Sequence, residues 1–166
     1  HSLEAEQAVL GGLLLSSRAW DSVADVITEA DFYREDHRLV FRAVAELSDG
    51  GKPCDAVTVS EWFESHGLVE QVDGGAYISQ LASNTPSAAN VRAYAEIVRE
   101  KSILRQLIDV GADITSGAFS LEGRSSRELL EEAERMVFAI ADEGQRSGST
   151  FVSVQEAINE AISKIQ

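Results

Sequence analysis

The chain has 166 residues and is acidic, since 28 Asp and Glu against 14 Lys and Arg give a net charge of −14. A chain that gripped DNA mainly by itself would need a basic stripe to displace the counterions of the phosphates, and none is visible. No apolar run approaches the ~20 residues of a membrane span, and the first residues lack the basic region of a signal peptide. The single cysteine, Cys54, cannot form an internal disulfide. We therefore expect no membrane partner and a cytoplasmic location.

The first hundred residues are predicted to form a compact multi-helix globular head, because their apolar residues recur at helical spacing. Helices are expected over residues 3–15, 19–27, 36–47, 59–66 and 76–82. Residues 56–59 are interpreted as a loop that enters the fourth of these helices. Gly11 and Gly12 lie inside the first helix. No strand precedes them, so close helix packing is preferred to a phosphate-binding loop.

The aromatic side chains of this region are assigned to its core. They are Trp20, Phe32, Tyr33, Phe41, Trp62 and Phe63. Stacking platforms for single strands are the alternative, which the missing basic groove disfavours. The three histidines, His1, His37 and His66, are far apart in the sequence and are expected to be structural or exposed rather than metal ligands. Cys54 is expected to be a small buried thiol.

A break, a cap and a long helix follow the head. Pro86 cannot lie inside a helix, Ser87 is a good N-cap, and no proline interrupts residues 88–114. The basic cluster on this helix, Arg99, Lys101 and Arg105, is interpreted as a solvated face because acidic residues accompany it.

A second long helix is predicted after a bend over residues 116–126, which contain glycine and serine. Ser125 and Glu128 have the spacing of a capping box at its start. The two helices are therefore predicted to form an antiparallel hairpin.

Both hairpin helices carry apolar stripes that are long for a pair standing alone, so part of this surface is expected to meet another chain. The candidate interface residues are Leu107, Ile108, Ile114, Phe119, Leu121, Leu129, Leu130, Met136 and Val137. A protein that stayed monomeric at high concentration would count against this hypothesis.

The end of the chain is predicted to be a flexible linker, residues 144–152, and a linker helix, residues 153–166. The helix has a narrow apolar seam formed by Val154, Ala157, Ile158, Ala161, Ile162 and Ile165. Such a seam needs a groove, which lies on an absent C-terminal domain, on a neighbouring subunit or on a crystal mate. The expected organisation is thus a head (1–100), a hairpin (101–143, its first helix beginning near 88), the linker and the linker helix.

The sequence contains no recognisable catalytic, cofactor-binding or metal-binding motif. The P-loop pattern G-x-x-x-x-G-K-[ST] is absent, and no histidine or cysteine has a second ligand at metal spacing. The acidic run Glu128, Glu131, Glu132 and Glu134 is interpreted as a solvated helix face rather than an acid–base pair. We therefore expect no catalytic, cofactor-binding or metal site in this chain.

The segment from Asn84 to Ile108 resembles the N-terminal domain of the bacterial replicative DNA helicase, the DnaB family. Further blocks resemble the same family in the same order: residues 1–12, 31–33 with 37–38, 53–58, 74–81 and 123–141. Each block is unspecific alone, whereas their joint order is specific and covers residues 1 to about 143.

The resemblance implies an all-α fold and a role in DNA replication. Members of the family are hexameric ATP-dependent helicases that unwind duplex DNA at replication forks, moving 5′ to 3′. Their N-terminal domains pair through the hairpins, form a collar as a trimer of dimers, and recruit the primase and, in some bacteria, the helicase loader. ATP, Mg and most DNA contacts belong to a RecA-like motor domain, which is absent from this sequence. The linker helix docks on the neighbouring subunit's motor.

The first hypothesis is therefore an oligomerisation and partner-recruiting domain of a replicative helicase, in which this chain has no catalytic site of its own. A stand-alone helical nucleic-acid-binding regulator is the alternative, which the acidic charge disfavours. A small helical enzyme is the third possibility, and the missing catalytic constellation speaks against it.

Overall fold

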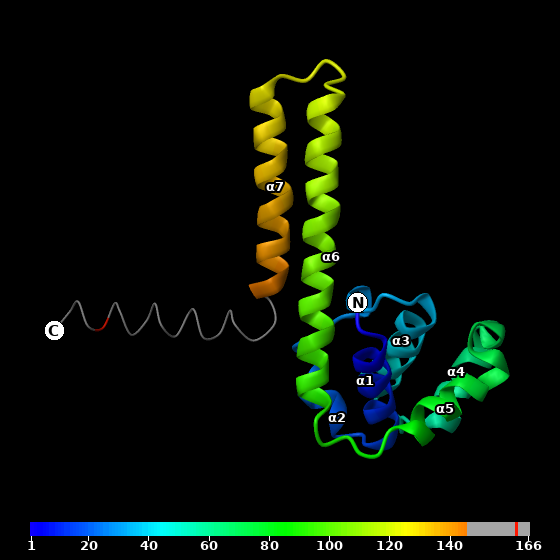
Figure 1. Ribbon diagram of the computed structural model, residues 1–166. Helices are drawn as coiled ribbons and strands as arrows, with labels where there is room; N and C mark the ends of the chain where they lie inside the picture. The colour runs from blue at the N-terminus through cyan, green and yellow to red at the C-terminus, as the bar shows by residue number, and fades with distance from the viewer. Residues whose placement is uncertain (146–161, 163–166) are drawn as a thin grey trace. The chain divides into compact units, whose positions relative to one another are not determined.

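The computed structural model describes residues 1–145 and residue 162, and every regular element among them is a helix (Figure 1). The expected all-α class is thereby confirmed. The chain divides into two compact units, residues 1–102 and residues 103–166. Within the described part, no helix combines the length and the apolar character that crossing a membrane requires. Of the expected seam, only Ile162 is described, with its side chain exposed, and the other seam residues lie outside the described residues.

The first unit, residues 1–102, is called the head below and is built around α1 (Leu3–Leu15). This helix contacts α5 (Ala76–Asn84) and α3 (Glu35–Asp49), and eight of its residues are buried. The other elements of the head are α2 (Ala19–Val23), η1 (Glu29–Asp31), α4 (Ala56–Ser65), η2 (Val69–Gly75) and the first turns of α6 (Val91–Phe119). Their buried apolar side chains form one continuous core.

Two adjacent glycines allow the chain to pass directly over α1. A Cβ atom on Gly11 would lie 1.8 Å from Thr85 Oγ1 and 2.6 Å from the Leu81 carbonyl oxygen. A Cβ atom on Gly12 would lie 3.1 Å from the Val91 side chain. The interpretation of these glycines as a site of close packing is therefore confirmed, and their small size lets α5 and the segment after it approach α1.

Two helix starts differ from those expected. Residues 56–59 are the first turn of α4 rather than a loop: Asp55 Oδ1 accepts the Thr58 N–H at 2.9 Å, and Thr58 Oγ1 accepts the Asp55 N–H at 2.9 Å. This reciprocal cap satisfies two amides that a helix start leaves unpaired. The long helix α6 begins at Val91, not at residue 88. Ser87 caps only a local turn, because its hydroxyl accepts the Ala89 N–H at 3.3 Å.

The aromatic core is as expected except at one position. Phe32, Phe41, Trp62 and Phe63 are buried, and Trp20 packs against the core while partly exposed. Tyr33 was expected inside but is about half-exposed, at 51% of its surface, and its ring stacks on that of His1 at 3.9 Å between centroids. The preceding Phe32 occupies the inward position instead.

The second unit, residues 103–166, contains the remainder of α6 and the helix α7 (Ser126–Gln145), which run antiparallel (Figure 1). These two stretches are called the hairpin below. The predicted cap is present in part, since Ser125 Oγ accepts the Glu128 N–H at 3.2 Å. The connection is shorter than the expected bend of residues 116–126, because α6 continues to Phe119. Gly117 lies in this last turn, where Leu129 of α7 packs 3.5 Å from the place of its missing Cβ.

Candidate functional site

The expected interface residues of the hairpin fall into two groups. The side chains of Leu107, Ile108, Ile114, Phe119, Leu121, Leu130 and Val137 are exposed. Leu129 and Met136 are half-buried and line an apolar cavity of about 260 Å³ between α6 and α7. Leu129 and Met136 therefore help to hold the hairpin together. The seven exposed residues are available to a second molecule, and two of them, Ile114 and Leu130, also line this cavity.

Two further exposed apolar residues extend this surface, Leu104 on α6 and Phe138 on α7, the latter 70% exposed. Phe138 follows Leu130 by eight residues and Leu104 precedes Leu107 by three, so each lies on the same helix face as its neighbour. Helical spacing in the sequence could therefore have identified both Leu104 and Phe138. The nine exposed apolar residues named here and in the preceding paragraph are a candidate interface.

A buried polar network lies inside the head. His37 is fully buried; its Nδ1 is 2.7 Å from Glu6 Oε1, and its Nε2 is 2.6 Å from the Tyr77 hydroxyl oxygen. The Tyr33 N–H donates to Glu6 Oε2 at 2.9 Å. Burial raises the pKa of Glu6, but the hydrogen bonds from His37 and Tyr33 outweigh it and hold this pKa below its ordinary value of 4.5. The Glu6 carboxylate is therefore ionised at neutral pH, and His37 Nδ1 is its donor.

A second network fixes the beginning of α6. Asp31, also buried, accepts hydrogen bonds from the Thr28 N–H at 2.8 Å, from Arg99 Nη1 at 2.9 Å and from the Ser102 hydroxyl at 2.8 Å. The interpretation of Arg99 as part of a solvated basic face is therefore wrong for this residue, whose side chain is 12% exposed. A buried carboxylate needs a cation, and Arg99 supplies it.

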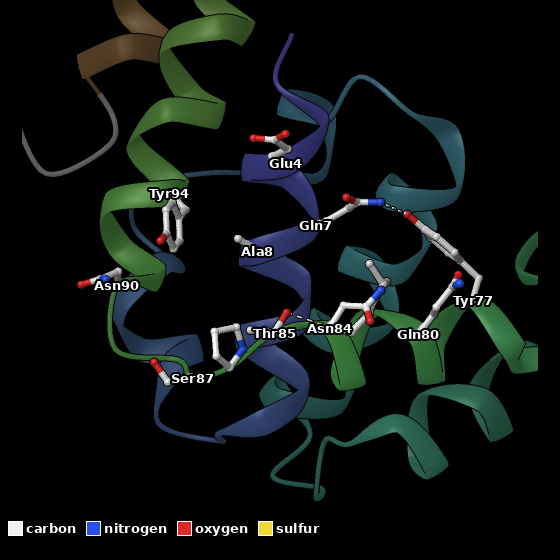
Figure 2. Close-up of a pocket in the computed structure, with 12 residues that line it drawn as sticks. Glu4, Gln7, Ala8, Tyr77, Gln80, Asn84, Thr85, Ser87, Asn90 and Tyr94 are labelled. Carbon is white, nitrogen blue, oxygen red and sulfur yellow. Dashed lines mark hydrogen bonds between the residues drawn. The ribbon is translucent and has the colours of Figure 1, made fainter.

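A pocket of about 250 Å³ opens on the head between α1, α5 and the segment that leads into α6 (Figure 2). Carboxamides and hydroxyls dominate its polar wall, with Gln7, Gln80, Asn84 and Tyr77 among them. Ala8, Leu81 and Pro86 provide the apolar lining. Sequence patterns did not indicate this site, because its residues come from three separated segments.

The acidic residues of α7 and the possible metal ligands form no reactive group in the described part of the chain. Glu128, Glu131 and Glu134 are exposed, and Glu132 is half-buried against Arg124 Nη1 at 2.7 Å. No three His, Cys, Asp or Glu side chains of the described residues are grouped so that they could hold a metal ion.

The fold and these surfaces define a class of protein: a helical head followed by a helical hairpin with an exposed apolar face. The profile of the family described as "DnaB-like helicase N terminal domain" matches residues 1–100. The chain belongs to this family, which confirms the resemblance seen in the sequence.

Individual relatives agree with this assignment. The chain is 44% identical over 165 residues to the replicative DNA helicase DnaB of Haemophilus influenzae, with 99% of this chain and 35% of that protein covered. It is 35% identical over 165 residues to the replicative DNA helicase DnaC of Bacillus subtilis, with 99% of this chain and 36% of that protein covered. The chain thus spans about a third of the length of these relatives.

Two solved structures share the fold. The crystal structure of the N-terminal domain of DnaB helicase from Mycobacterium tuberculosis superposes with a TM-score of 0.81 at 37% identity, with 84% of this chain and 97% of that chain covered. A DnaB-like replicative helicase, whose structure was described with its interactions with primase, superposes with a TM-score of 0.68 at 21% identity, with 95% of this chain and 35% of that chain covered.

Proposed function

We propose that this chain is the oligomerisation and partner-recruiting domain of a hexameric, ATP-dependent replicative DNA helicase that unwinds duplex DNA at replication forks. The observation that carries the proposal is the exposed apolar face of the hairpin in a chain of this family. Ile108, Leu130 and Phe138 are each at least 66% exposed. Large apolar side chains gathered in this way are typical of a surface that a partner covers.

The occupant of the hairpin face is proposed to be the hairpin of a second copy, with three such dimers in a hexamer. An isologous contact of this kind is self-complementary and closes on itself. The proposed domain organisation is a head, a pairing hairpin, and then a linker and linker helix that join the domain to a motor. The seam residues, including Ile162, are proposed to dock on the neighbouring motor.

The chemistry is proposed to lie in the remainder of the full-length protein, because the chain spans 35% of the Haemophilus relative. ATP, Mg and most DNA contacts are assigned to that remainder. Primase is the proposed partner of this domain, since a structural neighbour was described together with its interactions with primase. The helicase loader is a second proposed partner. The relatives are bacterial replication proteins, so the proposed location is the cytoplasm, where the chromosome lies.

Self-association is tested best at residues that lie outside the cavity between α6 and α7. Ile108→Asp and Phe138→Asp place a charge on the apolar face at side chains that are each 70% exposed and do not line that cavity. Light scattering of the wild type should give the mass of a dimer or larger, and each variant should weaken association by about tenfold or more. Met136→Asp is a poorer test, because it would also loosen the packing of α6 on α7.

Ala139→Asp is the matched control, since Ala139 is exposed and follows Leu130 by nine residues, on the opposite face of α7. It should leave the mass unchanged. A monomeric wild type at high concentration, or equal effects of Ala139→Asp and Ile108→Asp, would contradict pairing through this face. Retention of the cognate primase on immobilised wild-type protein tests the recruiting role separately, and failure to retain it would remove primase from the proposal.

The nucleic-acid-binding regulator gains no support from the described residues. Arginines on both units pair with carboxylates, as Arg42 does with Glu29 at 2.8 Å and Arg124 with Glu132 at 2.7 Å. Binding of single-stranded DNA that persists as salt rises would restore this alternative.

A further inference from the structure

The pocket of the head has a lining that is rich in carboxamides and holds one charged residue. Gln7, Gln80 and Asn84 contribute side-chain amides, and Glu4 is the charged residue. Figure 2 shows Tyr77 and Tyr94 on opposite sides of the pocket, with Ala8 between them. The cavity of about 250 Å³ is slightly smaller than the about 300–1,000 Å³ of small-molecule sites, and it can hold a few residues of a peptide.

The buried network of the head orients one wall of this pocket. Gln7 Nε2 donates to the Tyr77 hydroxyl oxygen at 3.2 Å, and that hydroxyl is bonded to His37 Nε2 at 2.6 Å. The Arg34 guanidinium lies 5.1 Å from the centre of the Tyr77 ring, and the His37 ring stacks on the same ring. Because Gln7 uses its nitrogen for Tyr77, its Oε1 is turned away from Tyr77 and is available as an acceptor (Figure 2).

Several other polar side chains of the wall make no hydrogen bond inside the described part of the head. The side-chain amides of Gln80 and Asn84 make no hydrogen bond to another described residue, and neither does the hydroxyl of Tyr94. By contrast, the Thr85 hydroxyl is already used, because it donates to the Leu81 carbonyl at 2.9 Å. The wall therefore offers a fixed acceptor on Gln7 and free carboxamides on Gln80 and Asn84 beside an apolar lining.

We propose that this pocket binds an extended peptide segment of a partner protein, without acidic side chains, through hydrogen bonds between the peptide main chain and the carboxamides of Gln7, Gln80 and Asn84, with Gln7 Oε1 as an acceptor. A carboxamide presents a donor and an acceptor in one plane, as a peptide group does, so the two pair in register. Glu4 and the net charge of −14 favour a basic or neutral segment over an acidic one. Nucleobases also pair with carboxamides, but their phosphates would meet this acidic chain.

The proposal does not depend on pairing of the hairpins, because every lining residue belongs to the head. Variants of the hairpin face should leave peptide binding intact, and variants of the pocket should leave the mass of the assembly intact. A failure of one proposal is therefore distinguishable from a failure of the other.

The experiment uses the whole chain with assigned amide resonances and two capped tripeptides, acetyl-Ala-Lys-Ala-amide and acetyl-Ala-Glu-Ala-amide. The lysine peptide should cause saturable shifts of the side-chain amides of Gln7, Gln80 and Asn84. The glutamate peptide should bind at least about threefold more weakly. Uniform, non-saturating shifts with both peptides would overturn the proposal, as would saturable shifts of these amides by oligothymidine and not by peptide.

Variants identify the groups that carry binding. Gln80→Ala and Tyr77→Phe should each weaken the lysine peptide by about fivefold, the first by removing a carboxamide and the second by releasing Gln7. Gln71→Ala is the matched control, because Gln71 is exposed and outside the pocket. Thermal unfolding shows whether the Tyr77→Phe variant remains folded. If that variant unfolds, Gln80→Ala still tests the site. Equal affinities for wild type, Gln80→Ala and Gln71→Ala would refute the assignment.

Discussion

Cys54 is a buried thiol whose acidity is suppressed by its surroundings. Burial raises its pKa to about 11, the adjacent Asp55 carboxylate adds to this effect, and a hydrogen bond with Ser48 opposes it. At pH 8 roughly one molecule in a thousand would then carry the reactive thiolate.

We expect the folded protein to react with Ellman's reagent at pH 8 far more slowly than free cysteine does. The same protein in concentrated urea should react completely within seconds to minutes, which serves as the control. A folded-state rate close to that of free cysteine would show that the thiol is accessible and ionised, contrary to this prediction.

Glu6 links the stability of the head to acid pH. Its pKa is held below 4.5 in the folded state, so its contribution is present above pH 4.5 and is lost as the pH falls through the lower, folded-state pKa. Glu6→Gln removes the carboxylate that His37 Nδ1 bonds and should cost about 2 kcal/mol of unfolding free energy at pH 7. The difference between the variant and the wild type should shrink below pH 4.5.

Urea unfolding of both proteins between pH 7 and pH 3 measures this difference directly. A constant gap across the range would show that Glu6 does not contribute through its charge. Other carboxylates also titrate in this interval, and comparison of the two proteins cancels their effect.

At the scale of elements, the sharpest prediction concerns the crossing of α1. Gly11→Ala places a methyl group where Thr85 Oγ1 and a carbonyl oxygen already lie, so the segment after α5 must move. Overpacking of this kind should lower the unfolding free energy by about 3 kcal/mol.

Gly111→Ala is the control for helix propensity, because a Cβ there meets nothing within 4 Å. It should be neutral or stabilising by up to about 1 kcal/mol. Thermal unfolding of the two variants compares them, and similar effects of both would mean that α1 does not need its close approach.

Helix positions were largely predictable from the sequence, while some boundaries were not. Spacing of apolar residues located α1, α3, α5 and both hairpin helices because each buries a face. The start of α6 was misplaced because Ala88 and Val91 pack over Gly12, a contact that no local pattern contains. Asp55 was missed as a cap because the β-branched residues Val57, Thr58 and Val59 favour extended structure locally, whereas the capping box and the burial of Val59 favour a helix.

The hairpin face and the pocket of the head also differ in how far the sequence predicts them. The apolar face of the hairpin repeats along single helices, so its residues could be named in advance. The buried networks join residues that are distant in the sequence, such as His37 with Glu6, 31 positions apart, and Ser102 with Asp31, 71 positions apart. Partners this distant become visible only when the chain is folded, and the pocket of the head was missed for that reason.

At the scale of the whole molecule, assembly should appear as a dependence of stability on concentration. If hairpins pair only when folded, mass action stabilises the paired state, and a tenfold rise in protein concentration should raise the melting temperature by about 2–4 °C. Circular dichroism at 222 nm over a hundredfold range of concentration measures this. Ile108→Asp should abolish the dependence, and its persistence in that variant would place the contact elsewhere.

Both tryptophans of the chain, Trp20 and Trp62, lie in the head. Their indole emission therefore follows one unit alone, and the hairpin contributes nothing to it. Far-ultraviolet dichroism, in contrast, senses every helix. One sample watched by both probes can thus reveal whether the two units melt together or in succession, without any label being attached.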